Sequence, residues 1–148
     1  MNKLFEKLNT LFSTLIVFQS NVKNFHWHIK GSDFFIFHKY TDDLSAKSLD
    51  FVDEVAEKLI MFDQSVETEY ANILKASLVK QFPKKFITSR LATQAIVEQM
   101  QTVLGICKEI QGLEQGLENE SIFVVAPLID EIVLFFHKFL WQFKSSIE

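Results

Sequence analysis

The first 30 residues carry an apolar repeat that strongly favours one long amphipathic helix. The repeat advances in alternating steps of four and three residues, through Leu4, Leu8, Leu11, Leu15, Phe18, Val22 and Phe25. Side chains at this spacing share one face of an α-helix, whereas a half-buried strand would need apolar residues at every second position. We therefore predict a helix over residues 3–30, ended by Gly31 and Ser32.

Two further segments continue the helical pattern. A second helix is predicted over residues 34–62, and the residues on its inner face are Phe37, Leu44, Phe51, Val55 and Leu59. A short helix over residues 69–78 follows, and then Pro83, Lys84 and Lys85 form the clearest linker in the chain. This linker marks a long crossover connection.

The last two helices are bounded by capping and breaking residues. The third is expected to start near Thr88 or Ser89 and to end near Gly112 or Gly116. The fourth has apolar positions from Ile129 to Ile147 at helical spacing. Pro127 fits best in its first turn, where a missing N–H costs little, and a kink within a longer helix is the alternative.

Composition agrees with an all-α fold. Only four Gly and two Pro occur among 148 residues, too few for the many tight turns of an all-β protein. The length suits one domain, residues 1–148. We predict a four-helix bundle with a short extra helix in the crossover between the second and third helices.

Charge and cysteine content bear on partners and location. The 15 basic and 19 acidic residues leave a net charge of −4, which predicts no general attraction to nucleic acid or anionic membranes. Cys107 is the sole cysteine, so no intrachain disulfide can form. No apolar run reaches the roughly 18 residues of a membrane span. These features favour a cytoplasmic protein without a membrane partner.

Five histidine and acidic residues have the spacing of metal ligands. His38 and Asp42 are four residues apart on the second predicted helix, as are Asp53 and Glu57, while His26 lies near the end of the first. His38 and Asp53 would be about 22 Å apart along one helix, too far to share an ion. Either the acidic residues form a solvated face, or a symmetric neighbour brings its Asp53 and Glu57 opposite these histidines.

The sequence disfavours a di-iron centre built within a single bundle. Di-iron centres inside one bundle use a Glu followed three residues later by a His on each of two helices. No Glu in this sequence has a His at that spacing.

Two stretches resemble the signature of the Dps family, the DNA-binding proteins from starved cells. The first runs from Asn24 through Gly31 to His38, and the second spans residues 53–58. The gaps of 12 residues from His26 to His38 and of 15 from His38 to Asp53 match the family spacing. Lys138 and Trp141 also resemble the last helix of the family.

The resemblance implies a ferroxidase centre shared between two subunits. His26 and His38 of one subunit, with Asp53 and Glu57 of its two-fold partner, would bind one or two iron ions, or zinc as a surrogate. Asp42 would be a further ligand or an acid behind the histidines. Trp27 would lie beside the centre and intercept reactive electrons.

The implied fold is the all-α, ferritin-like bundle, and the implied activity is that of a mini-ferritin. Fe(II) would be oxidised, preferably by hydrogen peroxide, and ferric oxide deposited inside a hollow dodecamer, which would protect the cell from oxidative stress. Phe34, Phe35 and Phe37, beside His38, are expected to wall the site.

Two features depart from the family pattern. DNA-binding members carry a Lys-rich tail ahead of the first helix, whereas Leu4 already belongs to the apolar repeat here, so we expect DNA binding to be unlikely. Aspartates usually line the three-fold pores, but residues 122–127 are largely apolar, leaving Glu118, Glu120 and Asp130 as candidate pore residues. Two alternatives stay open. The family name suggests a nucleoid-compacting protein, and the apolar segment leaves room for a structural shell with a degenerate metal site.

Overall fold

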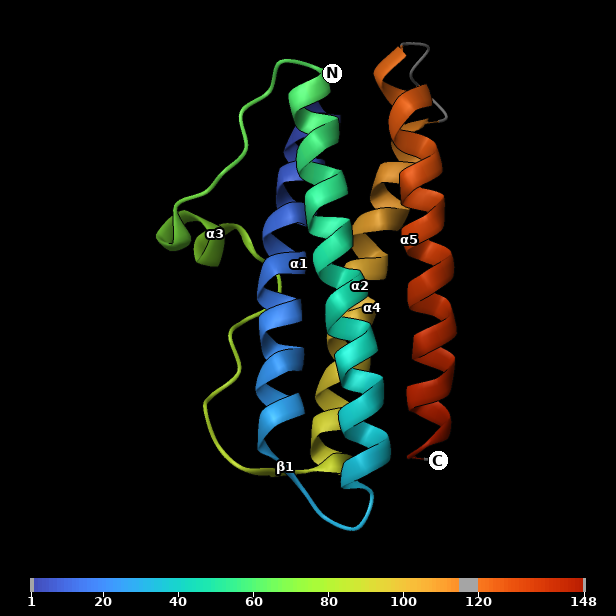
Figure 1. Ribbon diagram of the computed structural model, residues 1–148. Coiled ribbons are helices and arrows are strands. Elements are labelled where there is room, and N and C mark those ends of the chain that lie inside the picture. Colours follow the sequence, from blue (N-terminus) through green and yellow to red (C-terminus); the bar gives the residue numbers. More distant parts are fainter. Residues whose placement is uncertain (1, 115–119, 148) are drawn as a thin grey trace.

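Four long helices form the molecule. Of the 148 residues, the computed structural model describes residues 2–114 and 120–147. The long helices are α1 (Asn2–His28), α2 (Phe34–Met61), α4 (Ser89–Glu114) and α5 (Glu120–Ser145), and they lie side by side in a bundle (Figure 1). The predicted all-α bundle, with its short helix between the second and third long helices, is confirmed.

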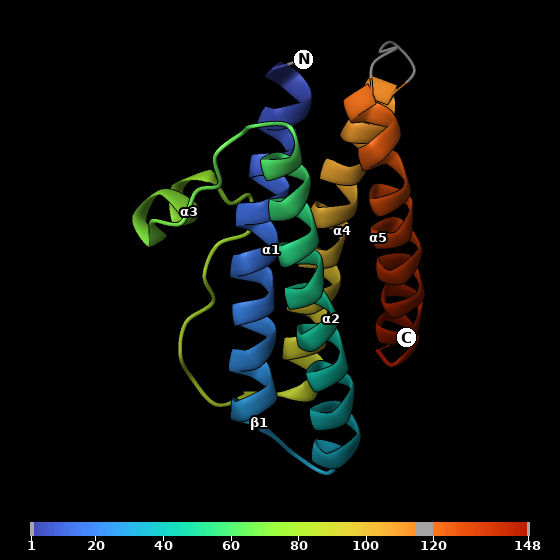
Figure 2. The same cartoon turned by 45° about the horizontal axis from the view of Figure 1, so that its top comes forward.

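The bundle has one long crossover because α2 and α4 run in the same direction (Figure 1). The crossover contains α3 (Tyr70–Ala76), slightly shorter than the predicted 69–78, which projects beside α1 on the side away from α5 (Figure 2). Within the described ranges, no helix combines the length and apolar character needed to cross a membrane.

Asparagine side chains of α1 hold the crossover against the bundle. The buried Asn21 accepts a hydrogen bond from the Phe82 N–H at 2.8 Å and donates to the Lys80 carbonyl at 2.9 Å. Asn24 donates to the carbonyls of Phe82, at 3.3 Å, and Pro83, at 3.1 Å. These bonds satisfy main-chain groups that lie outside regular secondary structure.

A small parallel ladder, which the sequence analysis did not predict, joins the ends of α1 and the crossover. Strand β1 (Ile29–Lys30) pairs with β2 (Ile87–Thr88), with Ile29 opposite Ile87. Helix α1 therefore ends at His28 rather than at residue 30. Gly31 follows with φ of +138°, a conformation that residues with a Cβ rarely adopt, and the chain turns into α2.

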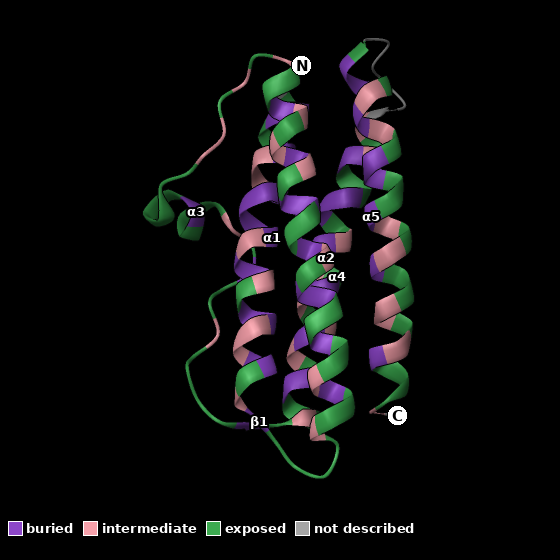
Figure 3. Ribbon diagram, viewed as in Figure 1, coloured by how far each residue is buried: buried purple, intermediate pink, exposed green. Residues whose placement is uncertain are grey.

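The core contains every residue of the predicted apolar repeat on α1, each no more than 1% exposed. The buried surfaces of the long helices face the interior of the bundle (Figure 3). At its centre, the Phe136 ring lies 5.5 Å from that of Phe18 and 6.3 Å from that of Phe51. Only Phe35, Phe86 and Phe123 of the 16 phenylalanines are exposed.

The preferred placement of Pro127 was wrong. Helix α5 begins at Glu120, so Pro127 lies inside the helix and not in its first turn. A proline there removes one main-chain hydrogen bond and disfavours the helix locally. Burial of Ile122 and Val125 in the core favours continuing the helix through residues 120–126. Tertiary packing thus overrides the local preference.

Candidate metal centre

The turn between α1 and α2 brings two histidines into contact. His26 lies in the last turn of α1 and His38 in the second turn of α2. Their rings stack with centroids 3.6 Å apart and planes inclined by 17°. The Phe34 ring stacks on His38 in turn, with centroids 5.0 Å apart. The structure therefore places the two predicted histidine ligands side by side.

Each imidazole has its Nδ1 atom in a hydrogen bond. The Nδ1 atom of His38 lies 2.8 Å from the main-chain carbonyl of His26. A carbonyl can only accept, so this nitrogen carries a hydrogen, and in the neutral ring Nε2 of His38 keeps its lone pair. The Nδ1 atom of His26 lies 3.1 Å from the Thr41 hydroxyl.

The electrostatic environment favours neutral His26. Burial of the ring and, next, the charge of His38 lower the pKa of His26 from its ordinary value. His26 is 6% exposed. A neutral imidazole can bind a transition metal, whereas a protonated one cannot.

Asp42 has a cationic partner that the sequence analysis did not assign. The Lys23 ammonium on α1 donates a hydrogen bond to Asp42 at 2.9 Å. This bond, together with the charge of Lys23, holds the pKa of Asp42 below its usual range. Both side chains are substantially exposed, so the pair contributes little to stability.

The side chains around the histidines differ in exposure. Trp27 is 65% exposed, and the Lys23 ammonium lies 5.9 Å from its ring. Phe35 is exposed too, whereas Phe37 is buried against Phe143 of α5, with ring centroids 6.3 Å apart. The expectation that Phe37 walls the site was therefore wrong, because its side chain points into the core of the bundle.

Asp53 and Glu57 lie further along α2, and both are exposed. The structure does not bring them to the histidines of the same chain. Within residues 2–114 and 120–147, no three side chains of His, Cys, Asp or Glu lie close enough together to hold a metal ion. One chain thus provides a histidine pair and a separate carboxylate pair.

Two of the three predicted pore residues, Glu120 and Asp130, lie on α5. Glu120 is exposed in the first turn of this helix. Asp130 accepts a hydrogen bond from Gln111 of α4 at 3.1 Å. Glu118 lies outside the described residues.

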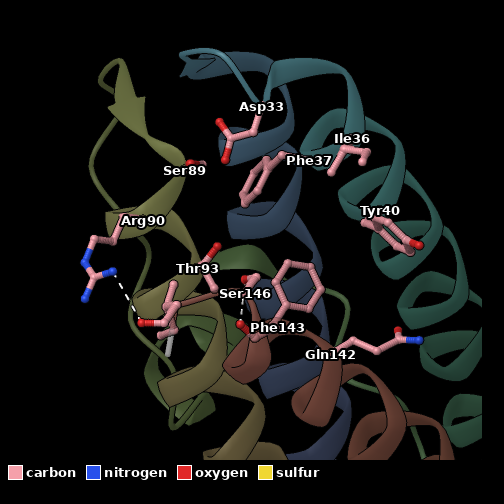
Figure 4. Close-up of a pocket in the computed structure, with 11 residues that line it drawn as sticks. Asp33, Ile36, Phe37, Tyr40, Ser89, Arg90, Thr93, Gln142, Phe143 and Ser146 are labelled. Carbon is pink, nitrogen blue, oxygen red and sulfur yellow. Dashed lines mark hydrogen bonds between the residues drawn. The ribbon is translucent and has the colours of Figure 1, made fainter.

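A cavity of about 270 Å³ lies between the ends of α2, α4 and α5 (Figure 4). Phe37, Phe143 and Ile36 contribute apolar walls, and Thr93 and Arg90 contribute polar groups. The Arg90 guanidinium donates to the main-chain carbonyl of Ile147 at 3.3 Å. None of the predicted metal ligands lines this cavity, and no motif in the sequence indicated it.

Sequence reasoning missed two residues that contact predicted ligands: Thr41, which contacts His26, and Lys23, which contacts Asp42. Both side chains reach predicted ligands from positions with no recognisable metal-binding pattern. Thr41 lies three residues after His38, and Lys23 three residues before His26, so each shares a helical face with a histidine. That spacing was the available signal.

Comparison with known proteins defines the class. The model of the ferritin-like domain matches residues 5–145. In the DNA protection during starvation protein of Helicobacter pylori, 28% of residues are identical over 145 residues, covering 98% of this chain and 99% of the relative. Fold, histidine pair and family model thus agree on a ferritin-like protein.

Solved structures share this fold. Helicobacter cinaedi CAIP is 28% identical with a TM-score of 0.90, covering 98% of this chain and 99% of that one. The Dps protein of Vibrio cholerae has a TM-score of 0.92 at 22% identity, covering 99% of this chain and 90% of its own, which shows the shared fold. This chain belongs to the Dps family.

Proposed function

We propose that this protein oxidises Fe(II), preferably with hydrogen peroxide, and stores the ferric product inside a hollow dodecamer in the cytoplasm. The observation that carries the proposal is the stacked pair of His26 and His38, whose Nδ1 atoms both have hydrogen-bond partners. Imidazole nitrogen is a suitable ligand for iron, and unprotonated Nε2 atoms would supply it.

The carboxylate pair would come from a second subunit. At 100° per residue, Leu49, Asp53, Glu57 and Ile60 lie within an arc of about 80° on α2. Leu49 is 53% exposed and Ile60 is 59% exposed. Aliphatic side chains on both sides of two carboxylates are poorly suited to open solvent and well suited to an interface. This arrangement supports a two-fold contact that places Asp53 and Glu57 opposite the histidines of the partner.

The residue types suit iron oxidation. Imidazoles from one subunit would hold Fe(II), and carboxylate oxygens from the other would stabilise the harder Fe(III) as it forms. With peroxide as oxidant, two Fe(II) ions each give up one electron, the O–O bond breaks, and two added protons complete two waters. This stoichiometry releases no hydroxyl radical. Trp27, next to His26 in the chain, is proposed to intercept any stray oxidising equivalent.

Subunit mixing tests the shared site. One variant carries His26→Ala and His38→Ala, and a second carries Asp53→Ala and Glu57→Ala. Each alone should oxidise Fe(II) with peroxide at the rate of a protein-free control. After unfolding together and reassembly, random pairing should restore about a quarter of the wild-type sites, because each mixed pair contains one intact site.

Two results would contradict the proposal. Wild-type rates in either variant would exclude these residues from the reaction, and no recovery in verified mixed assemblies would exclude a site shared in this way. A variant carrying Asp50→Ala, which removes a neighbouring exposed carboxylate from α2, serves as the matched control and should keep its activity. The net charge of −4 per chain supports no general attraction to DNA, so DNA binding is not part of the proposal.

A further inference from the structure

We propose that Thr41 is a positioning residue that directs the imidazole hydrogen of His26 to Nδ1 and keeps Nε2 free to bind iron. The inference rests on the proposed function in that it assigns His26 as a ligand. It adds a residue outside the ligand set, buried on α2 with no exposed surface.

The direction of the Thr41 hydroxyl decides the tautomer of His26. Its Oγ1 atom lies 2.8 Å from the Phe37 carbonyl and 3.1 Å from the His38 carbonyl. Because both carbonyls can only accept, the single hydroxyl hydrogen points toward them. Oγ1 then offers a lone pair to His26 at 3.1 Å, and Nδ1 of His26 must be the donor.

The two histidines therefore reach the same tautomer by different means. His38 donates from Nδ1 to the main chain of His26, and His26 donates from Nδ1 to the side chain of Thr41. Bonds of this kind commonly set which ring nitrogen of a histidine ligand faces the metal. Reversal of the Thr41 hydroxyl would move the hydrogen of His26 to Nε2 and remove one of the two nitrogen ligands.

Replacement of Thr41 by Val removes the hydroxyl while keeping the branched shape. In Thr41→Val, His26 has no acceptor at Nδ1, and the tautomer with hydrogen on Nε2 becomes the better one. Zn²⁺, which takes nitrogen and oxygen ligands and is not oxidised, probes the site without turnover. We expect Thr41→Val to weaken Zn²⁺ binding by about 10- to 100-fold, measured calorimetrically on the assembled, metal-free protein.

Two matched variants separate tautomer control from packing. Thr41→Ser keeps the hydroxyl and should bind Zn²⁺ within about threefold of wild type. Thr93→Val removes another buried threonine hydroxyl, 2% exposed and located on α4, and should leave binding unchanged. Unchanged affinity in Thr41→Val, or an equal loss in Thr41→Ser, would overturn the inference.

Neutron diffraction from deuterium-exchanged, metal-free crystals of the wild type gives a direct answer. Deuterium on Nδ1 of His26, with none on Nε2, is the expected result, and deuterium on Nε2 overturns the inference even if Thr41→Val does not fold. This measurement is independent of activity. Deuterium on Nδ1 in a protein that fails the subunit-mixing test would leave the control of the tautomer by Thr41 standing and reject the proposed function.

Discussion

Cys107 illustrates how burial controls the chemistry of a single residue. Its side chain is fully buried on α4, which raises the pKa of the thiol to about 12. The thiolate is the reactive form of cysteine, so its population decides the rate of oxidation or alkylation. A protein proposed to consume hydrogen peroxide thus keeps its one thiol in an unreactive form.

We expect Cys107 to resist thiol reagents while the protein is folded. At about pH 8, a pKa near 12 leaves on the order of one thiol in ten thousand ionised, against roughly a quarter for an ordinary cysteine. After addition of a chromogenic disulfide reagent, absorbance should show almost no reacting thiol in buffer and one reacting thiol per chain in denaturant. Rapid labelling of the folded protein would contradict this expectation.

Sequence spacing predicted that the two histidines meet, and it predicted little of what surrounds them. The spacing of His26 and His38, with Gly31 between them, indicated a turn that joins two helices, and the structure places the rings in contact. The pairing of Lys23 with Asp42 depends on how α1 packs against α2, and so does the contact of Thr41 with His26. Such contacts are set by tertiary geometry, which residue spacing alone does not specify.

At the scale of elements, α1 organises the fold. It contributes the apolar repeat to the core and its asparagines to the crossover. Asn21 is the centre of this second role, because it bonds the main chain at Lys80 and Phe82 and also donates to the Gln99 side chain at 3.1 Å. The part of the crossover between α3 and β2, which has no helix or strand, therefore has a defined path along the bundle.

Replacing Asn21 with Ala should destabilise the protein by about 2–4 kcal/mol, because main-chain groups of the crossover lose their partners in a partly buried environment. Urea unfolding followed by circular dichroism, at a fixed protein concentration, measures this change. Asn72→Ala provides the control, since Asn72 is exposed and its side chain donates a long hydrogen bond of 3.4 Å to Glu69. Equal stability of the two variants would show that the crossover bonds contribute nothing.

The elements themselves differed in how well the sequence predicted them. The repeat on α1 was reliable because burial of a complete helical face outweighs local preferences. The start of α5 was not, since a rule for Pro127 is local and the packing of Ile122 and Val125 is not. The two-residue strands were equally hard to foresee, because Ile29 meets Ile87 only after α1, α4 and the crossover are in place.

At the scale of the whole molecule, the surface is more apolar than a solitary chain requires. Large apolar side chains that are more than half exposed include Trp27, Phe35, Ile36, Leu49, Ile60, Met61, Tyr70, Leu78, Phe86, Leu91, Phe123, Leu134 and Trp141. They are spread over all four long helices, α3 and the crossover. A chain that buries several of its faces against identical copies would have this distribution.

A charge added at Leu49, on the surface of α2 formed by Leu49, Asp53, Glu57 and Ile60, should prevent assembly. Wild-type protein is expected near 206 kDa by light scattering, which is twelve times the 17.2 kDa chain. Leu49→Glu adds a carboxylate to the proposed contact, next to Asp50 and near Asp53, and should shift most of the protein to a lower mass. Its circular dichroism should be unchanged, because Leu49 is exposed within one chain.

Gln101→Glu, an exposed position on α4, adds the same charge and should leave the assembly intact. A wild-type chain that remains a monomer, or a Leu49→Glu variant with undiminished mass, would reject this face as a contact.

The hydrogen bonds at Nδ1 of His26 and of His38 differ in whether a substitution can remove the acceptor. The acceptor for His38 is a main-chain carbonyl, which every amino acid possesses, so no substitution can delete it. The acceptor for His26 is the hydroxyl of the Thr41 side chain, which a single substitution can remove. A substitution of the hydrogen-bond partner can therefore disturb His26 but not His38. A lineage losing metal affinity without losing a ligand would be expected to change first at Thr41.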